Sequence, residues 1–127
     1  MTKHISIPDH NETSPKRSSG ATAGAFTFVT VDALDPETGR RVAEADTIEN
    51  EVKVLFKRAD AALAEAGLSR KDLVKSTCWI SDEAHRFDFL YAYRDECATG
   101  VYPQRITMSV GLPGDCRGAI EFVAVAQ

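Results

Sequence analysis

The chain has 127 residues, of which 43% are hydrophobic and 27% charged, and its formal net charge is −4. This length fits a single domain spanning residues 1–127 that buries about two thirds of the surface of its unfolded chain, so no stabilising metal or disulfide is required. The acidic balance and the absence of a dense stripe of Lys and Arg weigh against nucleic acid as the main partner.

The cysteine pattern and the hydropathy pattern indicate in which cellular compartment the protein is located. Cys78, Cys97 and Cys116 are an odd number without a CxxC pair, and Cys78 lies in an apolar strand pattern where a free thiol packs as a small hydrophobic group. No apolar run is long enough to span a bilayer, and the N-terminus lacks the hydrophobic segment of a signal peptide. We therefore expect a cytoplasmic protein with no membrane partner. The three histidines are scattered and no HxxE or CxxC spacing occurs, so no metal site is expected.

The N-terminal part predicts little regular structure. Residues 1–24 are polar and rich in Ser, Thr and Gly, which predicts a loosely ordered arm in which residues 4–7 could form a short edge strand. Residues 25–31 alternate good β-formers and predict a first strand. The strand ends at the turn Asp35-Pro36-Glu37-Thr38-Gly39.

A long helix follows this turn. Asp46 with Glu49 three residues later is a capping-box pattern that predicts the helix start, and Gly67 predicts a left-handed cap at its end. Between them, apolar residues recur at steps of three and four. The stripe consists of Ile48, Val52, Leu55, Phe56, Ala59, Leu63 and Ala66, whereas Glu49, Lys53, Lys57 and Arg58 are expected on other faces.

A strand and a second helix come next. Residues 69–72 form another capping-box pattern on a short turn, which leads into a strand at residues 74–80. The second helix is expected at about residues 83–97, closed by Gly100. Its apolar stripe is Phe87, Leu90, Tyr91 and Ala98, with Phe89 and Tyr93 as an adjacent strip that would widen its buried face.

Two further strands complete the chain and carry the candidate site. In residues 102–110, Arg105, Thr107 and Ser109 share one face, and the other face is largely apolar. Residues 119–125 are apolar on both faces except at Glu121. Because a buried carboxylate needs a partner, we expect Glu121 and Arg105 to look into one shared, partly enclosed polar site.

The order of elements predicts an α+β fold with two helices on one face of a mixed sheet. The opposite face of the sheet would then be left uncovered by this chain, although it carries apolar residues. We therefore expect another copy to cover it in a homo-oligomer.

A resemblance to a known family rests on three segments, namely Pro103-Gln104-Arg105, Leu112-Pro113-Gly114-Asp115 and Ile120-Glu121. From about Ser14 to the C-terminus, the chain resembles the Rid (YjgF) family of reactive-intermediate deaminases. The resemblance implies a homotrimer of a chorismate-mutase-like fold, with cofactor-free sites in the clefts between subunits. It also implies that Arg105 binds the carboxylate of a small imine or enamine substrate. Glu121 would position the water that releases ammonia and a keto acid, as a general base or by orientation alone.

Several positions depart from the family pattern. Ser14-Pro15-Lys16 stands where many of these deaminases carry Gly-Pro-Tyr, and Val29-Thr30-Val31 stands where they carry Ser-Gly-Gln. Thr107 replaces a frequent cysteine, and Cys116 lies on the loop before Glu121. We therefore expect the substrate to contact Arg105 and an altered set of residues, namely Lys16, Val29, Thr30, Thr107 and Cys116. A pathway-specific deaminase or hydrolase of aromatic or heterocycle breakdown, and a non-enzymatic metabolite-binding protein, remain as alternatives.

Overall fold

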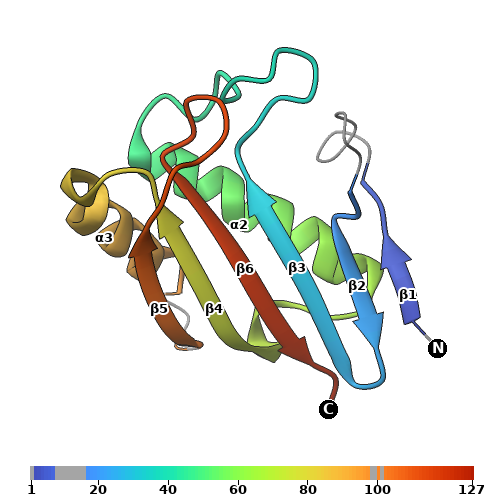
Figure 1. Ribbon diagram of the computed structural model, residues 1–127. Helices are drawn as coiled ribbons and strands as arrows, with labels where there is room; N and C mark the ends of the chain where they lie inside the picture. The colour runs from blue at the N-terminus through green and yellow to red at the C-terminus, as the bar shows by residue number, and fades with distance from the viewer. Residues whose placement is uncertain (1, 8–16, 98–99, 101) are drawn as a thin grey trace.

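The computed structural model describes residues 2–7, 17–97, 100 and 102–127. In this part of the chain, six strands form one sheet in the order β1-β2-β3-β6-β4-β5, and two α-helices cover one of its faces (Figure 1). This arrangement confirms the expected α+β fold with two helices on one face of a mixed sheet. The elements are β1 (Thr2–Ile5), β2 (Gly20–Ala23), β3 (Phe26–Asp32), α2 (Ile48–Glu65), η1 (Arg70–Asp72), β4 (Leu73–Ile80), η2 (Glu83–His85), α3 (Arg86–Glu96), β5 (Gln104–Ser109) and β6 (Gly118–Val125).

The strand pairing brings the two predicted site strands close together. Strand β6 lies between β3 and β4 and is antiparallel to both, whereas β4 pairs with β5 in parallel. A parallel pair needs a crossover connection, and α3 supplies it between β4 and β5. Strand β5 is consequently an edge strand, and one side of its backbone is unpaired within the described chain.

Strand β2 lies within the expected loosely ordered arm, so that expectation was wrong for residues 20–23. Three of its four residues, Gly20, Ala21 and Ala23, have weak β propensity, so the local pattern does not predict a strand there. Pairing with β3 holds the strand in place, and the hydroxyl oxygens of Thr22 and Thr27 lie 2.9 Å apart across the pair. Tertiary pairing therefore overrides the local preference.

Helix α2 follows its predicted stripe but starts differently. The N-cap is Thr47 rather than Asp46, because the Thr47 hydroxyl accepts a hydrogen bond from the Asn50 amide at 3.0 Å. Gly67 has a φ of 73°, which confirms the left-handed turn after the helix. Arg58 was expected on a face other than the apolar stripe, yet it is buried, with only 9% of it exposed.

The apolar stripe of α3 differs from the expected one. Phe89 and Tyr93 are buried, whereas Phe87 and Tyr91 are 71% and 54% exposed. The helix is oriented by close contact with the sheet: a Cβ on Gly118 would lie 2.6 Å from the Phe89 ring. Both strips were visible in the sequence, but only this contact decides which one is buried.

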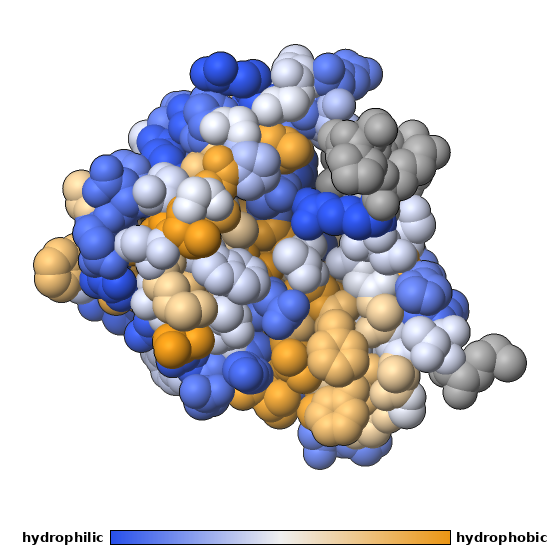
Figure 2. All heavy atoms as spheres, viewed as in Figure 1, coloured by the Kyte–Doolittle hydropathy of each residue, from blue (hydrophilic) through white to orange (hydrophobic). Residues whose placement is uncertain are grey.

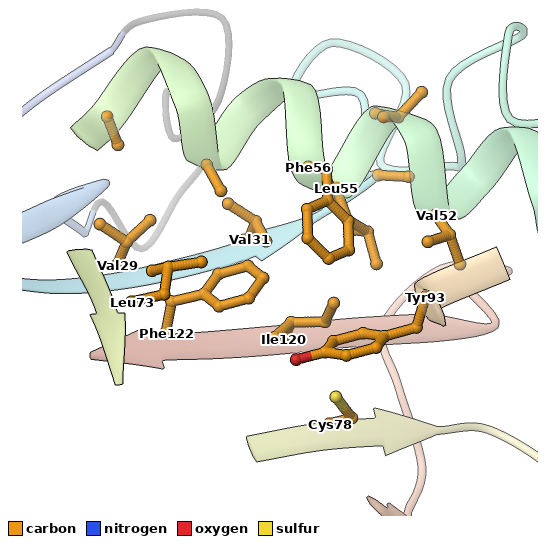
Figure 3. Close-up of a cluster of buried hydrophobic side chains, with 14 of the residues drawn as sticks. Val29, Val31, Val52, Leu55, Phe56, Leu73, Cys78, Tyr93, Ile120 and Phe122 are labelled. Atoms are coloured by element: carbon orange, nitrogen blue, oxygen red, sulfur yellow. The ribbon is translucent and has the colours of Figure 1, made fainter. Parts of the chain in front are cut away.

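The hydrophobic core fills the space between the helices and the sheet (Figure 3). Phe56 of α2 lies at its centre, and its ring makes edge-on contacts with Tyr93 at 5.4 Å and with Phe122 at 5.3 Å. Such contacts add to the gain from burying apolar surface. The core thereby fixes α3 relative to β6 and β4, which support the candidate site.

No described helix or strand covers the other face of the sheet, as expected. Phe26, Phe28, Ile106 and Met108 lie on it with 41–49% of each residue exposed. Figure 2 shows hydrophobic side chains gathered over the lower part of β3 and β6. In the described part of the chain, neither α-helix is long and apolar enough to cross a membrane.

Candidate active site

Arg105 lies on the helix side of edge strand β5 and is exposed to solvent. Its guanidinium carbon is 5.5 Å from the centre of the Tyr93 ring, and its Nη1 donates a hydrogen bond to the Thr107 hydroxyl at 2.7 Å. No described carboxylate lies within ion-pair distance of it. The guanidinium is therefore positioned by the protein while most of its donors stay available to an anion.

Tyr93 forms a rigid support for this guanidinium. Its hydroxyl lies 2.6 Å from the Ser76 hydroxyl in a buried hydrogen bond. Burial raises the pKa of Tyr93, so the phenol stays neutral. Burial likewise raises the pKa of the nearby Cys78 thiol to about 11, which keeps it protonated and unreactive at neutral pH.

A cleft of about 410 Å³ opens beside Arg105. This volume lies in the range of small-molecule sites, about 300–1,000 Å³. The residues that line it are Leu90, Tyr93, Arg94, Tyr102, Pro103 and Arg105. The cleft therefore joins apolar walls to an available cation.

A polar network continues along β5 beyond Thr107. The Ser109 hydroxyl donates to Glu83 at 2.5 Å, and Arg86 makes an ion pair with Glu83 at 2.6 Å. Arg86 also donates to the backbone carbonyl of Thr107 at 3.3 Å. The hydrogen bonds from Arg86 and Ser109 lower the pKa of Glu83 to about 2. Local sequence patterns do not predict this network, because η2 and β5 are far apart along the chain.

Glu121 lies on the opposite, uncovered face of the sheet. In the strand register it sits beside Thr30 of β3 and Thr77 of β4. The carboxylate is half-buried and has no hydrogen-bond partner among the described residues. It is therefore free to bind a water molecule or a polar group from outside this chain.

Arg105 and Glu121 cannot face one site within a single chain. Arg105 pairs with Ser76, whereas Glu121 pairs with Thr77, the next residue of the same strand. Cross-strand partners share a face and consecutive residues alternate, so the two side chains lie on opposite faces. The expectation of one shared site is wrong for a single chain, and only a second copy could bring the two groups together.

The remaining expected contact residues divide into three groups. Thr107 touches Arg105, and Thr30 shares the face of Glu121. The side chains of Val29 and Cys116 are buried, 0% and 3% exposed, so neither can contact a bound solute in this structure. Burial also raises the pKa of Cys116 to about 11. Lys16 lies outside the described residues.

Helix α2 carries two buried charged side chains, Glu51 and Arg58, whose bonds to backbone groups were not predicted from the sequence. Glu51 accepts hydrogen bonds from the backbone amides of Arg117 and Gly118 and from Arg117 Nε at 2.8 Å. Arg58 donates to the backbone carbonyls of Asp32 and Leu34. Glu51 and Arg58 are seven residues apart, with buried Leu55 between them, so helical periodicity places both on the buried face of α2. This spacing could have been used to predict their burial from the sequence.

Among the described residues, no group of three His, Cys, Asp or Glu could hold a metal ion.

Comparison with known proteins identifies the family. The family model described as Endoribonuclease L-PSP matches residues 18–127. The chain belongs to the Rid (YjgF) family. A RutC family protein from Aquifex aeolicus (strain VF5) is 34% identical over 111 residues, covering 85% of this chain and 86% of that protein.

Solved structures agree with this assignment. A Thermotoga maritima protein has 26% identity and a TM-score of 0.84, with 100% of this chain and 99% of that chain covered. The Rid family protein YyfA from Yersinia pestis has 23% identity and a TM-score of 0.84, with 99% and 100% covered, and shares the fold. The resemblance carried by the Arg105 and Glu121 segments is thereby confirmed at the level of the family.

Proposed function

We propose that this Rid protein hydrolyses a small carboxylate-bearing imine or enamine to a keto acid and ammonia. The observation that carries the proposal is the state of Arg105, an exposed guanidinium held by Tyr93 and Thr107 without a carboxylate partner among the described residues. The cleft of about 410 Å³ beside it suits a small organic acid. Membership of the Rid family supports the reaction class.

We propose that the working site lies between two copies in a cytoplasmic homotrimer. A site that uses both Arg105 and Glu121 needs Arg105 from the edge of one sheet and Glu121 from the open face of another, because the two lie on opposite faces. The exposed apolar residues of that open face supply a surface for such assembly. The three free cysteines agree with a reducing compartment.

In the proposed reaction, Arg105 binds the substrate carboxylate through two parallel hydrogen bonds and fixes the imine carbon in place. Glu121 of a second copy orients a water molecule or takes its proton as the water oxygen bonds to the imine carbon. The carbon–nitrogen π electrons move to nitrogen, which takes up a proton. In the resulting carbinolamine, the hydroxyl proton passes to the nitrogen, and the carbon–nitrogen bond breaks as the carbonyl forms, so that ammonia leaves.

The family model's description as an endoribonuclease does not extend to a proposal for this chain. The net charge of −4 and the lack of a dense basic stripe in the sequence disfavour binding to a polyanion. A small carboxylate needs only the local charge of one arginine.

The test is ammonia release from freshly generated 2-imino acids, measured for wild type, Arg105→Ala and Arg40→Ala at equal oligomer concentration. Arg40 is an exposed arginine that pairs with Asp115 and serves as the charge-matched control. We expect Arg105→Ala to lose on the order of 100-fold or more in kcat/KM, because the carboxylate loses a charge-assisted anchor. Arg40→Ala should remain within about twofold of wild type. A fully active Arg105→Ala protein would refute the proposal, and tight binding of a keto acid without turnover would instead favour a metabolite-binding role.

A further inference from the structure

The cleft beside Arg105 contains a second guanidinium. Of the six described residues that line it, Arg94 and Arg105 are cationic and none is acidic. The chain as a whole carries a net charge of −4, so this cleft departs locally from the balance of the protein. Two cations that line one small cleft repel each other, and an anionic ligand between them is attracted by both.

Arg94 is weakly held in the present structure. Its Nη2 lies 3.3 Å from Asp95, and the two side chains are 61% and 65% exposed. Its guanidinium carbon also lies 5.0 Å from the centre of the Tyr91 ring. Exposed ion pairs of this kind contribute little to the free energy of folding. A carboxylate in the cleft can therefore take the place of Asp95 at low cost.

Arg86, on the same helix, differs clearly from Arg94. It donates two hydrogen bonds to Glu83 and a third to the Thr107 carbonyl, so its guanidinium is occupied by the protein. Arg86 does not line the cleft. The contrast shows that availability to a ligand belongs to Arg94 and Arg105 rather than to every arginine near β5.

The rest of the cleft is suited to a short hydrocarbon body. Leu90, Tyr102 and Pro103 supply apolar walls, and Tyr102 is 62% exposed. A ligand with one anionic group at each end and a few methylene groups between them would match both guanidinium groups and these walls.

We propose that Arg94 binds a second carboxylate, so that the preferred substrate is a small imino or enamino dicarboxylate rather than a monocarboxylate. This inference rests on the proposed function of Arg105 as the anchor of the first carboxylate. It assigns to Arg94 the selection of the substrate and leaves the chemistry of deamination unchanged.

The test compares matched pairs of ligands on wild type, Arg94→Ala and Lys71→Ala. Lys71 is an exposed cation on η1 that does not line the cleft, so it controls for net charge. Binding is measured by calorimetry with 2-oxoglutarate and 2-oxobutyrate, and turnover with the corresponding imino acids. We expect Arg94→Ala to weaken 2-oxoglutarate binding and the kcat/KM of its imine about tenfold, from loss of one charge-assisted contact. Values for 2-oxobutyrate and its imine should change less than about twofold, and Lys71→Ala should leave both series unchanged.

Equal effects of Arg94→Ala on both ligand series, or failure of 2-oxoglutarate to bind to the wild type, would overturn the inference. The Arg105→Ala variant separates this failure from failure of the proposed function. If Arg105→Ala abolishes turnover of both imines while Arg94→Ala does not discriminate between them, only the dicarboxylate preference is lost. If Arg105→Ala stays active, the proposed function itself is wrong.

Discussion

Charged groups in this protein fall into two contrasting regions. On α2, Glu51 and Arg58 are almost completely buried, and each is bonded to backbone groups and to an opposite charge. On β5 and β6, Arg105 and Glu121 have no ion-pair partner among the described residues. Both are nevertheless held in defined positions, because their strands are paired within the sheet.

The difference separates charges that stabilise the fold from charges that are available to a ligand. A buried charge without partners costs several kcal/mol, so Glu51 and Arg58 are retained only with their full set of contacts. An exposed guanidinium pays no such cost and can exchange water for a ligand. A charged side chain whose hydrogen bonds and ion pairs are all made within the protein therefore indicates a structural role. A charged side chain that is held in place but lacks an ion-pair partner indicates a binding role.

The sharpest test of the structural side is Glu51→Ala. This change removes the acceptor of Arg117 Nε and of the backbone amides of Arg117 and Gly118, whereas Arg117 Nη2 keeps its hydrogen bond to the Ala45 carbonyl. We expect the free energy of unfolding to fall by about 3–5 kcal/mol, measured by urea denaturation. The Glu51→Gln variant keeps one acceptor oxygen and should lose less. A loss below about 1 kcal/mol for Glu51→Ala would remove the distinction between the two regions.

A second test concerns the uncovered face of the sheet. Phe28 is 42% exposed there and stacks on Phe26, with ring centres 6.3 Å apart. We expect Phe28→Glu to weaken self-association at least about tenfold, because like charges would be brought together in the proposed interface. Sedimentation velocity measures the change. Phe87→Glu, on the exposed side of α3, is the control and should leave the oligomer intact. Dissociation by both variants, or by neither, would contradict an interface on the open face.

The smallest expected effect is the pH dependence contributed by Glu83. Its folded-state pKa is lowered to about 2 from 4.5 by hydrogen bonds from Arg86 and Ser109. A lowered pKa means that this stabilisation is present above pH 4.5 and is lost as the pH falls toward 2. We expect the Tm difference between wild type and Glu83→Gln to be small at pH 6 and to shrink further between pH 4.5 and 2. A difference that grows on acidification would show that the Glu83 network does not favour the ionised carboxylate.

Much of the fold could be predicted from local patterns. The strands at residues 25–31 and 119–125 and the helical stripe around Leu55 follow from local sequence patterns, and the structure confirms them. The grouping of Arg105 with Thr107 on one side of β5 follows from the same alternation. Family membership could also be predicted, from segments that lie on β5, β6 and the loop between them.

Other features depend on contacts between distant residues. The orientation of α3 is set by Phe89 against Gly118, and the choice of Thr47 over Asp46 as a cap is set by backbone geometry. Alternation shows that Glu121 and Arg105 each have a defined side, but only the register with Thr77 shows that the sides are opposite. The placement of the two side chains on opposite faces determines whether one chain can form the site, and it cannot be predicted from the sequence of either strand alone.

The central claim is that Arg105 and Glu121 act together from different copies of the chain. The most direct measurement mixes Arg105→Ala and Glu121→Ala subunits in equal amounts by unfolding and refolding them together, and then assays ammonia release. Each variant alone should be inactive. In a randomly mixed cyclic trimer, about a quarter of the sites would receive both intact residues, so activity should return to about a quarter of the wild-type value. No recovery from a mixture shown to contain mixed trimers would mean that the two residues do not complete one site between subunits.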